Sequence, residues 1–294
     1  MDAHGIRLTA CPVCGGAPVA WRVRTTPQGE WPIVRCPDCG FAFANPRPDL
    51  EYLSAFYAEH GLTDLEEARP FASVAELWAR ENQFPNSSLD GRRMVDTAVR
   101  LRQGKGGTSL DVGSGWGVTS HFARAAGFAP TMLEINPTRL AVATALVGVA
   151  PSEQLFEDFA APDGSYDLIV MSQVLEHAAD VGAWVEKAAH LLAPGGVLVV
   201  AVPNFASIFR RLLGVADPFI VPPEHLNFFS PSSLSHLLRR YGLDVAARQW
   251  VSRLSPDARR RRLGPLAPAG PLLFALIDRL HLGMYINIYA RKPR

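Results

Sequence analysis

The sequence has little net charge, because 29 lysines and arginines nearly balance 28 aspartates and glutamates among its 294 residues. This balance argues against a protein built mainly to coat nucleic acid or an anionic membrane. A membrane-spanning run is also lacking, since the longest stretch without Asp, Glu, Lys or Arg, 188–209, is broken by Pro194 and Pro203. Residues 1–10 lack the apolar core of a secretory signal. We therefore expect a cytoplasmic protein that does not enter a membrane.

Cysteine is scarce, and its four copies form two C-P-x-C-G pairs near the N-terminus. Two residues between cysteines let both thiolates face one ion, and the following glycine relieves strain where the backbone curls. Four thiolates suit a closed, structural zinc site, with iron as the alternative. Residues 18–34 read as two short strands, so 1–48 is expected to form a zinc ribbon. The expected metal ligands are Cys11, Cys14, Cys36 and Cys39.

The next segment, 49–107, is expected to be a helical lid or linker. Asp49 is a candidate N-cap for a helix over 50–60, which includes Tyr57, and two more helices are expected over 73–82 and 89–102. From residue 108 onward, short apolar strands alternate with helices, which is typical of an α/β sheet with parallel strands.

The first of these strands runs into the loop Gly113-Ser114-Gly115-Trp116-Gly117, which opens a helix. Such a turn lets the backbone approach a ligand. It departs from the G-x-G-x-x-G pattern of nicotinamide dinucleotide sites, and Asp111 precedes it where a pyrophosphate would meet a negative charge. Glu134, at the end of the second strand, is placed to bind ribose hydroxyls. Two acids in this arrangement suit a cationic ligand that carries adenosine and an amino acid, which is S-adenosylmethionine.

Four stretches together resemble the class I S-adenosylmethionine-dependent methyltransferases: 110–117, 132–137, 166–177 and 191–203. The resemblance implies a Rossmann-like α/β fold over 108–294, with a seven-stranded sheet, helices on both faces, and the β-rich run 284–290 inserted antiparallel. It implies that the methionine part of the cofactor is held by the loop and Asp111, and ribose by Glu134 with Ile135 beside it. It also implies that adenine is held by Asp158, as the acid at the end of the third strand, with Phe159, and the methionine side by Ser172 and Gln173. The loop residues concerned are Gly113, Ser114, Gly115 and Gly117.

The candidate bases for methyl transfer are His177, Glu224 and His225. His177 follows the fourth strand, where the transferred methyl should lie, but it could instead make only a structural hydrogen bond. Glu224 and His225 lie in 205–230, an insertion expected to cover the acceptor. A glutamate beside a histidine can orient the imidazole, although sequence neighbours can also point apart.

The two C-P-x-C-G pairs, the helix with Tyr57 and the Glu224-His225 pair together resemble the zinc-containing C-methyltransferases of deoxysugar biosynthesis. In that family a Tyr-His-Glu-His stretch carries the base, whereas here Val221-Pro222-Pro223 precede Glu224, and the family's further C-terminal domain has no counterpart in this sequence. The resemblance implies a small-molecule acceptor, from sugar or natural-product biosynthesis, with C-methylation favoured over O- or N-methylation.

Two alternatives stay open. The first is an RNA methyltransferase, because a zinc ribbon before a methyltransferase also resembles the ribosomal-RNA guanine methyltransferases. The run Arg259–Arg262 could bind RNA or an acidic acceptor. The ribbon itself has few basic residues, which disfavours nucleic acid. The second alternative is a protein that binds the cofactor without transferring methyl.

The later part of 263–277 is expected to be a helix closing the core rather than a membrane or dimer contact. The sequence leaves the oligomeric state open.

Overall fold

The computed structural model describes residues 5–49, 51–53, 55–56, 71–84, 87–104 and 106–294. The expected helix over 50–60 lies partly outside them, and Tyr57 lies outside them entirely. At its start, the Asp49 carboxylate accepts a hydrogen bond from the Tyr52 N–H at 2.8 Å, as expected of an N-cap.

The N-terminal module is a small antiparallel sheet built around a hairpin. Strands β2 (Val19–Thr26) and β3 (Gly29–Arg35) meet at the expected turn, and β4 (Ala42–Ala44) pairs with β3. The fourth strand, β10 (Asn227–Phe228), comes from the insertion expected to cover the acceptor. A separate pair joins β1 (Gly5–Ile6) to β5 (Arg47–Pro48). The module and the insertion therefore share one sheet.

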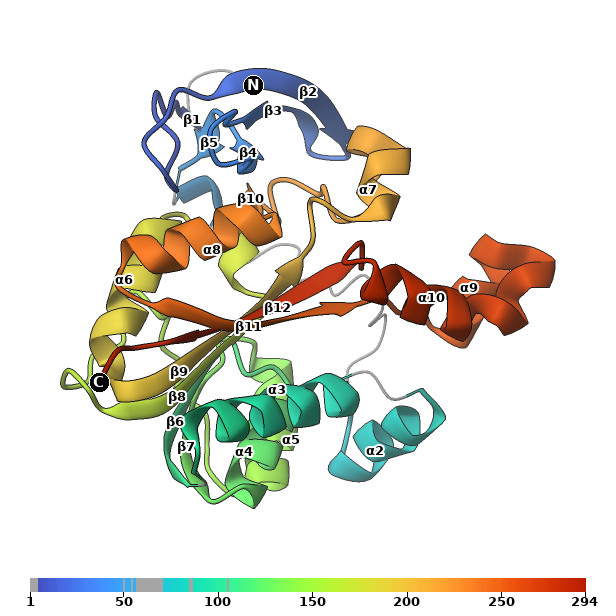
Figure 1. Cartoon of the computed structure of the whole chain (residues 1–294). Helices are drawn as coiled ribbons and strands as arrows, with labels where there is room; N and C mark the ends of the chain where they lie inside the picture. The colour runs from blue at the N-terminus through green and yellow to red at the C-terminus, as the bar shows by residue number, and fades with distance from the viewer. Residues whose placement is uncertain (1–4, 50, 54, 57–70, 85–86, 105) are drawn as a thin grey trace.

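The central sheet has the strand order β11-β12-β9-β8-β6-β7 (Figure 1). The four strands β7, β6, β8 and β9 are parallel, and β12 runs antiparallel between β9 and β11, as predicted for the last β-rich run. The bounds are β6 Gly107–Val112, β7 Phe128–Leu133, β8 Tyr166–Ser172, β9 Leu192–Pro203, β11 Asp244–Val251 and β12 Tyr285–Arg291.

The prediction of seven strands differs from the structure, whose described residues form six in this sheet. Beyond β7, the chain makes only an isolated parallel bridge between Leu133 and Ser152. Pro151 has no N–H with which to extend a ladder, and 156–158 form a turn. The edge position that a seventh strand would take is therefore reduced to one bridge.

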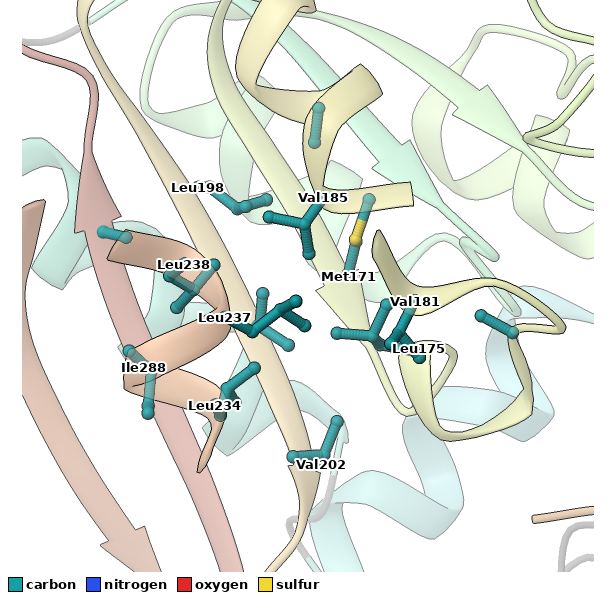
Figure 2. Packing of buried hydrophobic residues seen from close by; sticks show 14 of the residues in the cluster. Met171, Leu175, Val181, Val185, Leu198, Val202, Leu234, Leu237, Leu238 and Ile288 are labelled. Atoms are coloured by element: carbon teal, nitrogen blue, oxygen red, sulfur yellow. The ribbon is translucent and has the colours of Figure 1, made fainter. Parts of the chain in front are cut away.

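Helices cover both faces of the sheet, as expected. On one face α3 (Ser87–Arg102) and α4 (Val118–Ala125) bury Met94, Val95 and Ala123 against β8 and β9. On the other face lie α6 (Val181–Leu191) and α8 (Pro231–Arg240), whose leucines and valines meet Leu198 and Ile288 (Figure 2). Although α3 was assigned to the lid or linker, it packs as a helix of the central domain.

Local signals explain where several helices begin. Asn136 caps α5 (Pro137–Val147), and the Asp180 carboxylate accepts from two N–H groups at the start of α6. Ser230 and Ser233 form a capping box for α8. Helix α6 ends at Leu191, and Gly195 and Gly196 belong to β9.

The other helices lie at the edges. Helix α2 (Val74–Gln83) contacts α5, while α7 (Ile208–Leu213) and the 3-10 turn η2 (Gly214–Ala216) belong to the insertion. Helices α9 (Pro256–Leu263) and α10 (Gly270–Arg279), joined by η3 (Gly264–Ala269), project from the sheet beyond β11 and β12 (Figure 1). A short 3-10 turn, η1 (Leu175–His177), follows β8. Among the described residues, every helix is too short or too polar to cross a bilayer.

Candidate cofactor and acceptor site

The loop between β6 and α4 is a backbone cradle that only glycine can form. Gly113, Gly115 and Gly117 have φ values of +65°, +56° and +77°, in the left-handed region. A Cβ on Gly113 would overlap Val174, and one on Gly117 would lie 3.0 Å from Val147 Cγ2. The N–H of Ser114, a buried residue of this loop, donates to the Leu133 carbonyl at 2.8 Å, which ties the loop to β7. The three glycines therefore let the backbone turn tightly between β6 and α4.

Asp111 lies beneath this loop and is only 4 % exposed. Its carboxylate accepts a hydrogen bond from the Ser120 hydroxyl at 2.7 Å. Burial raises the pKa of Asp111 to about 7, and the nearby negative charge of Glu134 adds to this rise. A buried acid poised near neutrality is ready to pair with a cationic group.

Glu134 joins the loop to the end of β7. One carboxylate oxygen accepts from the Gly115 N–H at 2.8 Å, and the other accepts from the Asn136 N–H at 2.7 Å. Arg139 Nη1 lies 3.9 Å from this carboxylate. Ile135, next to it, is exposed beside the cradle. Glu134 is therefore fixed against the loop, and ribose binding at this corner stays a prediction.

The expected adenine contacts occupy a different setting from that predicted. Asp158 is exposed and lies in a turn, because the strand it was expected to end is reduced to one bridge. Phe159 is half-buried, with its ring centroid 6.4 Å from that of Tyr166. Glu157, the neighbouring acid, accepts from the Trp184 indole at 2.9 Å.

The end of β8 lies directly beside the cradle. Ser172 ends the strand, and Gln173 follows with φ +57° while its N–H donates to the Ala201 carbonyl at 2.8 Å. This turn aims Val174 at Gly113. The structure therefore brings Ser172 and Gln173 beside the loop, and their contact with the methionine side of the cofactor stays a prediction.

The two candidate histidines, His177 and His225, come together although 47 residues lie between them in the sequence. The ring centroids of His177 and His225 are 4.8 Å apart, at 80°. Nδ1 of His177 faces the Glu224 carbonyl, and Nδ1 of His225 faces the Phe219 carbonyl, each at 2.8 Å. A carbonyl can only accept, so each Nδ1 carries hydrogen and each Nε2 keeps its lone pair.

Burial keeps both rings neutral. It lowers the pKa of His177 to about 3, with the neighbouring His225 as a further cause, and lowers the pKa of His225 to about 4. The Glu224 backbone serves this pair through its carbonyl, so its role here does not require its carboxylate.

Sequence reasoning missed Glu176, which precedes His177 and is 1 % exposed. Among the described residues, neither of its carboxylate oxygens has a hydrogen-bond partner. Burial raises its pKa to about 8, with the charge of Glu224 as a further cause. Glu176, His177 and His225 offer donor atoms within 4.8 Å of one another, which one divalent cation could bridge.

Beside His225, a hollow opens between the end of β9 and the insertion. Its walls combine aromatic and polar side chains, including a cation and a buried acid. The lining includes Phe205, Phe219, Phe228, Ile220, Arg210, Asp217 and His225. Such a mixture suits a small, partly apolar molecule.

The four cysteines meet in the N-terminal module. Sγ of Cys11 lies 3.6 Å from that of Cys39, and Sγ of Cys14 lies 3.4 Å from that of Cys36. All four sulfurs lie within 4.8 Å of one another. A tetrahedron with metal–sulfur bonds of about 2.3 Å has edges of about 3.8 Å, so the donor set fits a zinc ion.

Comparison with known proteins gives the class. Residues 86–248 match the model of a family described as a methyltransferase domain, which is more than half of the chain. The chain therefore belongs to this family. The match begins before α3, in keeping with the packing of that helix on the sheet.

Curated relatives and solved structures agree with this class. The ubiquinone biosynthesis O-methyltransferase of Xanthomonas axonopodis pv. citri is 30 % identical over 193 residues, which cover 61 % of this chain and 80 % of the relative. The fold is similar to that of 1,6-didemethyltoxoflavin-N1-methyltransferase from Burkholderia thailandensis, a structure with bound S-adenosylhomocysteine (TM-score 0.53, 15 % identity, covering 88 % of this chain and 98 % of that one). It is also similar to an S-adenosylmethionine-dependent methyltransferase from Mesorhizobium loti (TM-score 0.52, 19 % identity, covering 71 % and 99 %). The chain is an S-adenosylmethionine-dependent methyltransferase.

Proposed function

We propose that this enzyme methylates a small molecule seated in the hollow beside His225. The observation that supports this most directly is the lining: three phenylalanines and one neutral histidine meet beside the end of β9. S-adenosylmethionine supplies the methyl group and its own leaving group. The chain has to orient the acceptor and remove its proton.

His225 is the proposed base. Its Nδ1–H is held by the Phe219 carbonyl, so Nε2 can receive the acceptor's proton while the ring stays oriented. His177 lies against it, and its Nδ1–H is fixed by the Glu224 carbonyl. The proposed roles are therefore proton acceptance by His225, support of that ring by His177, and positioning of His177 by the Glu224 backbone.

We assign carbon as the preferred methylated atom, on the resemblance to the zinc-containing sugar C-methyltransferases. The names of the O-methyltransferase relative and of the N1-methyltransferase with a similar fold make oxygen and nitrogen the other outcomes to test. The four cysteines are proposed to hold a structural zinc ion, because four thiolates leave no open position for catalysis.

The test has two stages. Calorimetry first measures binding of S-adenosylhomocysteine, and then release of that product is followed with panels of sugars, phenols and nitrogen heterocycles. Turnover by the parent enzyme, with at least a hundredfold loss in His225→Ala and unchanged cofactor binding, would support the proposal. Turnover only with RNA, whose binding falls steeply with salt, would contradict it.

A pH profile separates a base from a structural histidine. If His225 removes the proton, kcat/KM should rise with pH through the pKa of His225, which burial lowers to about 4. His225→Gln should lose this rising limb of the profile. An unchanged limb in the variant would mean that another group accepts the proton.

A further inference from the structure

Exposed leucines gather on three neighbouring elements. Of the fourteen large apolar side chains that are exposed among the described residues, seven lie on or directly beside α7, η3 and α10. Leu272, Leu276 and Leu280 recur every four residues and are 79 %, 53 % and 58 % exposed. The others are Leu212, Leu213, Leu266 and Leu273. We call these seven residues the leucine surface.

These leucines are accompanied by positive charge. Arg211 on α7 and Arg279 on α10 are exposed, and so are Arg260, Arg261 and Arg262 on α9, the helix directly before η3. The nearby acids are largely engaged: Asp257 pairs with Arg260, Asp278 accepts from Ser252, and Asp217 is buried. The neutral balance of the whole chain therefore conceals a local excess of arginine.

The two parts of the surface are joined at the hollow. The Phe209 ring on α7 lies 6.3 Å from the Phe274 ring on α10, and both belong to a small cluster that includes Phe219. Phe219 also lines the hollow beside His225. In Figure 1, α9 and α10 stand away from the sheet, in keeping with the exposure of their leucines.

We infer that the leucine surface docks reversibly on an anionic bilayer, with its leucines entering the interface and the arginines binding headgroup phosphates. Exposed leucines beside arginines are the composition by which helices bind such an interface without crossing it. A second copy of this chain fits less well, because a twofold contact through the same surface would bring the arginine runs toward each other. Docking would place the mouth of the hollow next to the lipid.

The test is sedimentation of the purified full chain with vesicles of phosphatidylcholine alone or with 30 % phosphatidylglycerol. We expect binding to the anionic vesicles that weakens with salt. Leu272→Glu/Leu276→Glu should abolish it, whereas Val19→Glu/Val23→Glu, which changes two exposed valines on β2, should not. Arg261→Gln/Arg262→Gln should lower the partition coefficient about fivefold per arginine, and Arg7→Gln/Arg22→Gln is the matched control.

Circular dichroism and S-adenosylhomocysteine binding show whether each variant is folded, independently of the acceptor. Equal binding to both vesicle types, no binding to either, or equal loss in the β2 control would overturn the inference. It would also be overturned if the parent were a dimer by light scattering and Leu272→Glu/Leu276→Glu made it monomeric, because the surface would then join two copies.

Discussion

The glycine at the end of β6 sits where two constraints coincide. Gly113 has φ +65°, and a Cβ there would overlap Val174 at the end of β8. Gly113→Ala should therefore move the loop away from the ligand and weaken S-adenosylhomocysteine binding at least tenfold, and Gly113→Arg should abolish it. Gly104→Ala is the control, because nothing lies within 4 Å of its added Cβ. Calorimetry showing equal affinities for Gly113→Arg and the parent would refute the assignment of the loop.

Asp111 gives the site a pH dependence whose direction follows from its raised pKa of about 7. Below that pH the carboxyl is protonated and cannot pair with a cofactor ammonium, and above it the group is ionised. Affinity for S-adenosylhomocysteine should therefore rise about tenfold per pH unit up to about 7 and then level off. Titrations from pH 5.5 to 8.5 check this. Asp111→Asn should bind weakly with a flat profile, and a parallel slope in the variant would point to another group.

At this scale the sequence predicted what depends on neighbours in the chain. Asp111 and Glu134 could be found because Asp111 lies just before a glycine turn and Glu134 directly follows an apolar strand. Glu176 could not be found, because it is a candidate only through its complete burial by segments far away in sequence. In the sequence alone, a buried Glu-His pair after a strand cannot be told from an exposed one. Asp158 was assigned to a strand end that the structure reduces to a bridge.

The strand β10 links the N-terminal cysteine module to the central domain. Asn227 Nδ2 donates to the carbonyl of Ala178 at 2.7 Å, and its Oδ1 accepts from Arg47 Nη2 at 2.6 Å. Arg47 is 5 % exposed, and burial lowers its pKa to about 10. Asn227 thus satisfies a buried guanidinium that would otherwise lose a charged hydrogen bond.

Asn227→Ala should lower the free energy of unfolding by about 2–4 kcal/mol, because it leaves buried carbonyls and a buried cation without this partner. Urea denaturation checks the loss. His236→Ala, at an exposed position on α8, should change stability by less than about 0.5 kcal/mol. A loss below about 1 kcal/mol in Asn227→Ala would show that water or a neighbour replaces the amide.

Element positions were predictable where the periodicity and caps were strong, as for α5, α6 and β12. The strand β10 was not predicted, since two residues carry no alternating pattern and their pairing partner, β4, lies far earlier in the chain. The same holds for α3, whose amphipathic pattern indicated a helix but not the surface it covers. Long-range pairing therefore accounts for most of what the sequence left open.

At the scale of the whole molecule, the cysteine module pairs with β10, the strand that directly follows the proposed acceptor site. Asn227 pairs with Phe43 and Phe228 with Ala42, only two residues after His225. The Phe41 ring lies 4.9 Å from that of Phe229, and Arg240 donates to the Val13 carbonyl at 3.0 Å. The cofactor loop, by contrast, lies between β6 and α4, and its Ser114 N–H is tied to the end of β7.

Removal of the proposed zinc should therefore impair acceptor turnover while S-adenosylhomocysteine binding is kept. Without metal, four thiols cannot hold the two knuckles together, so β4 and then β10 should lose their order. We expect a strong chelator, or Cys36→Ser, to reduce acceptor turnover at least tenfold while S-adenosylhomocysteine affinity changes by less than about threefold. Metal analysis after gel filtration should show one zinc per parent chain, and zinc added back after chelation should restore turnover. If cofactor binding and turnover fall together, the cysteine module stabilises the whole fold. If neither falls, β10 keeps its position without metal, and the sheet that the module shares with the insertion does not depend on the cysteines.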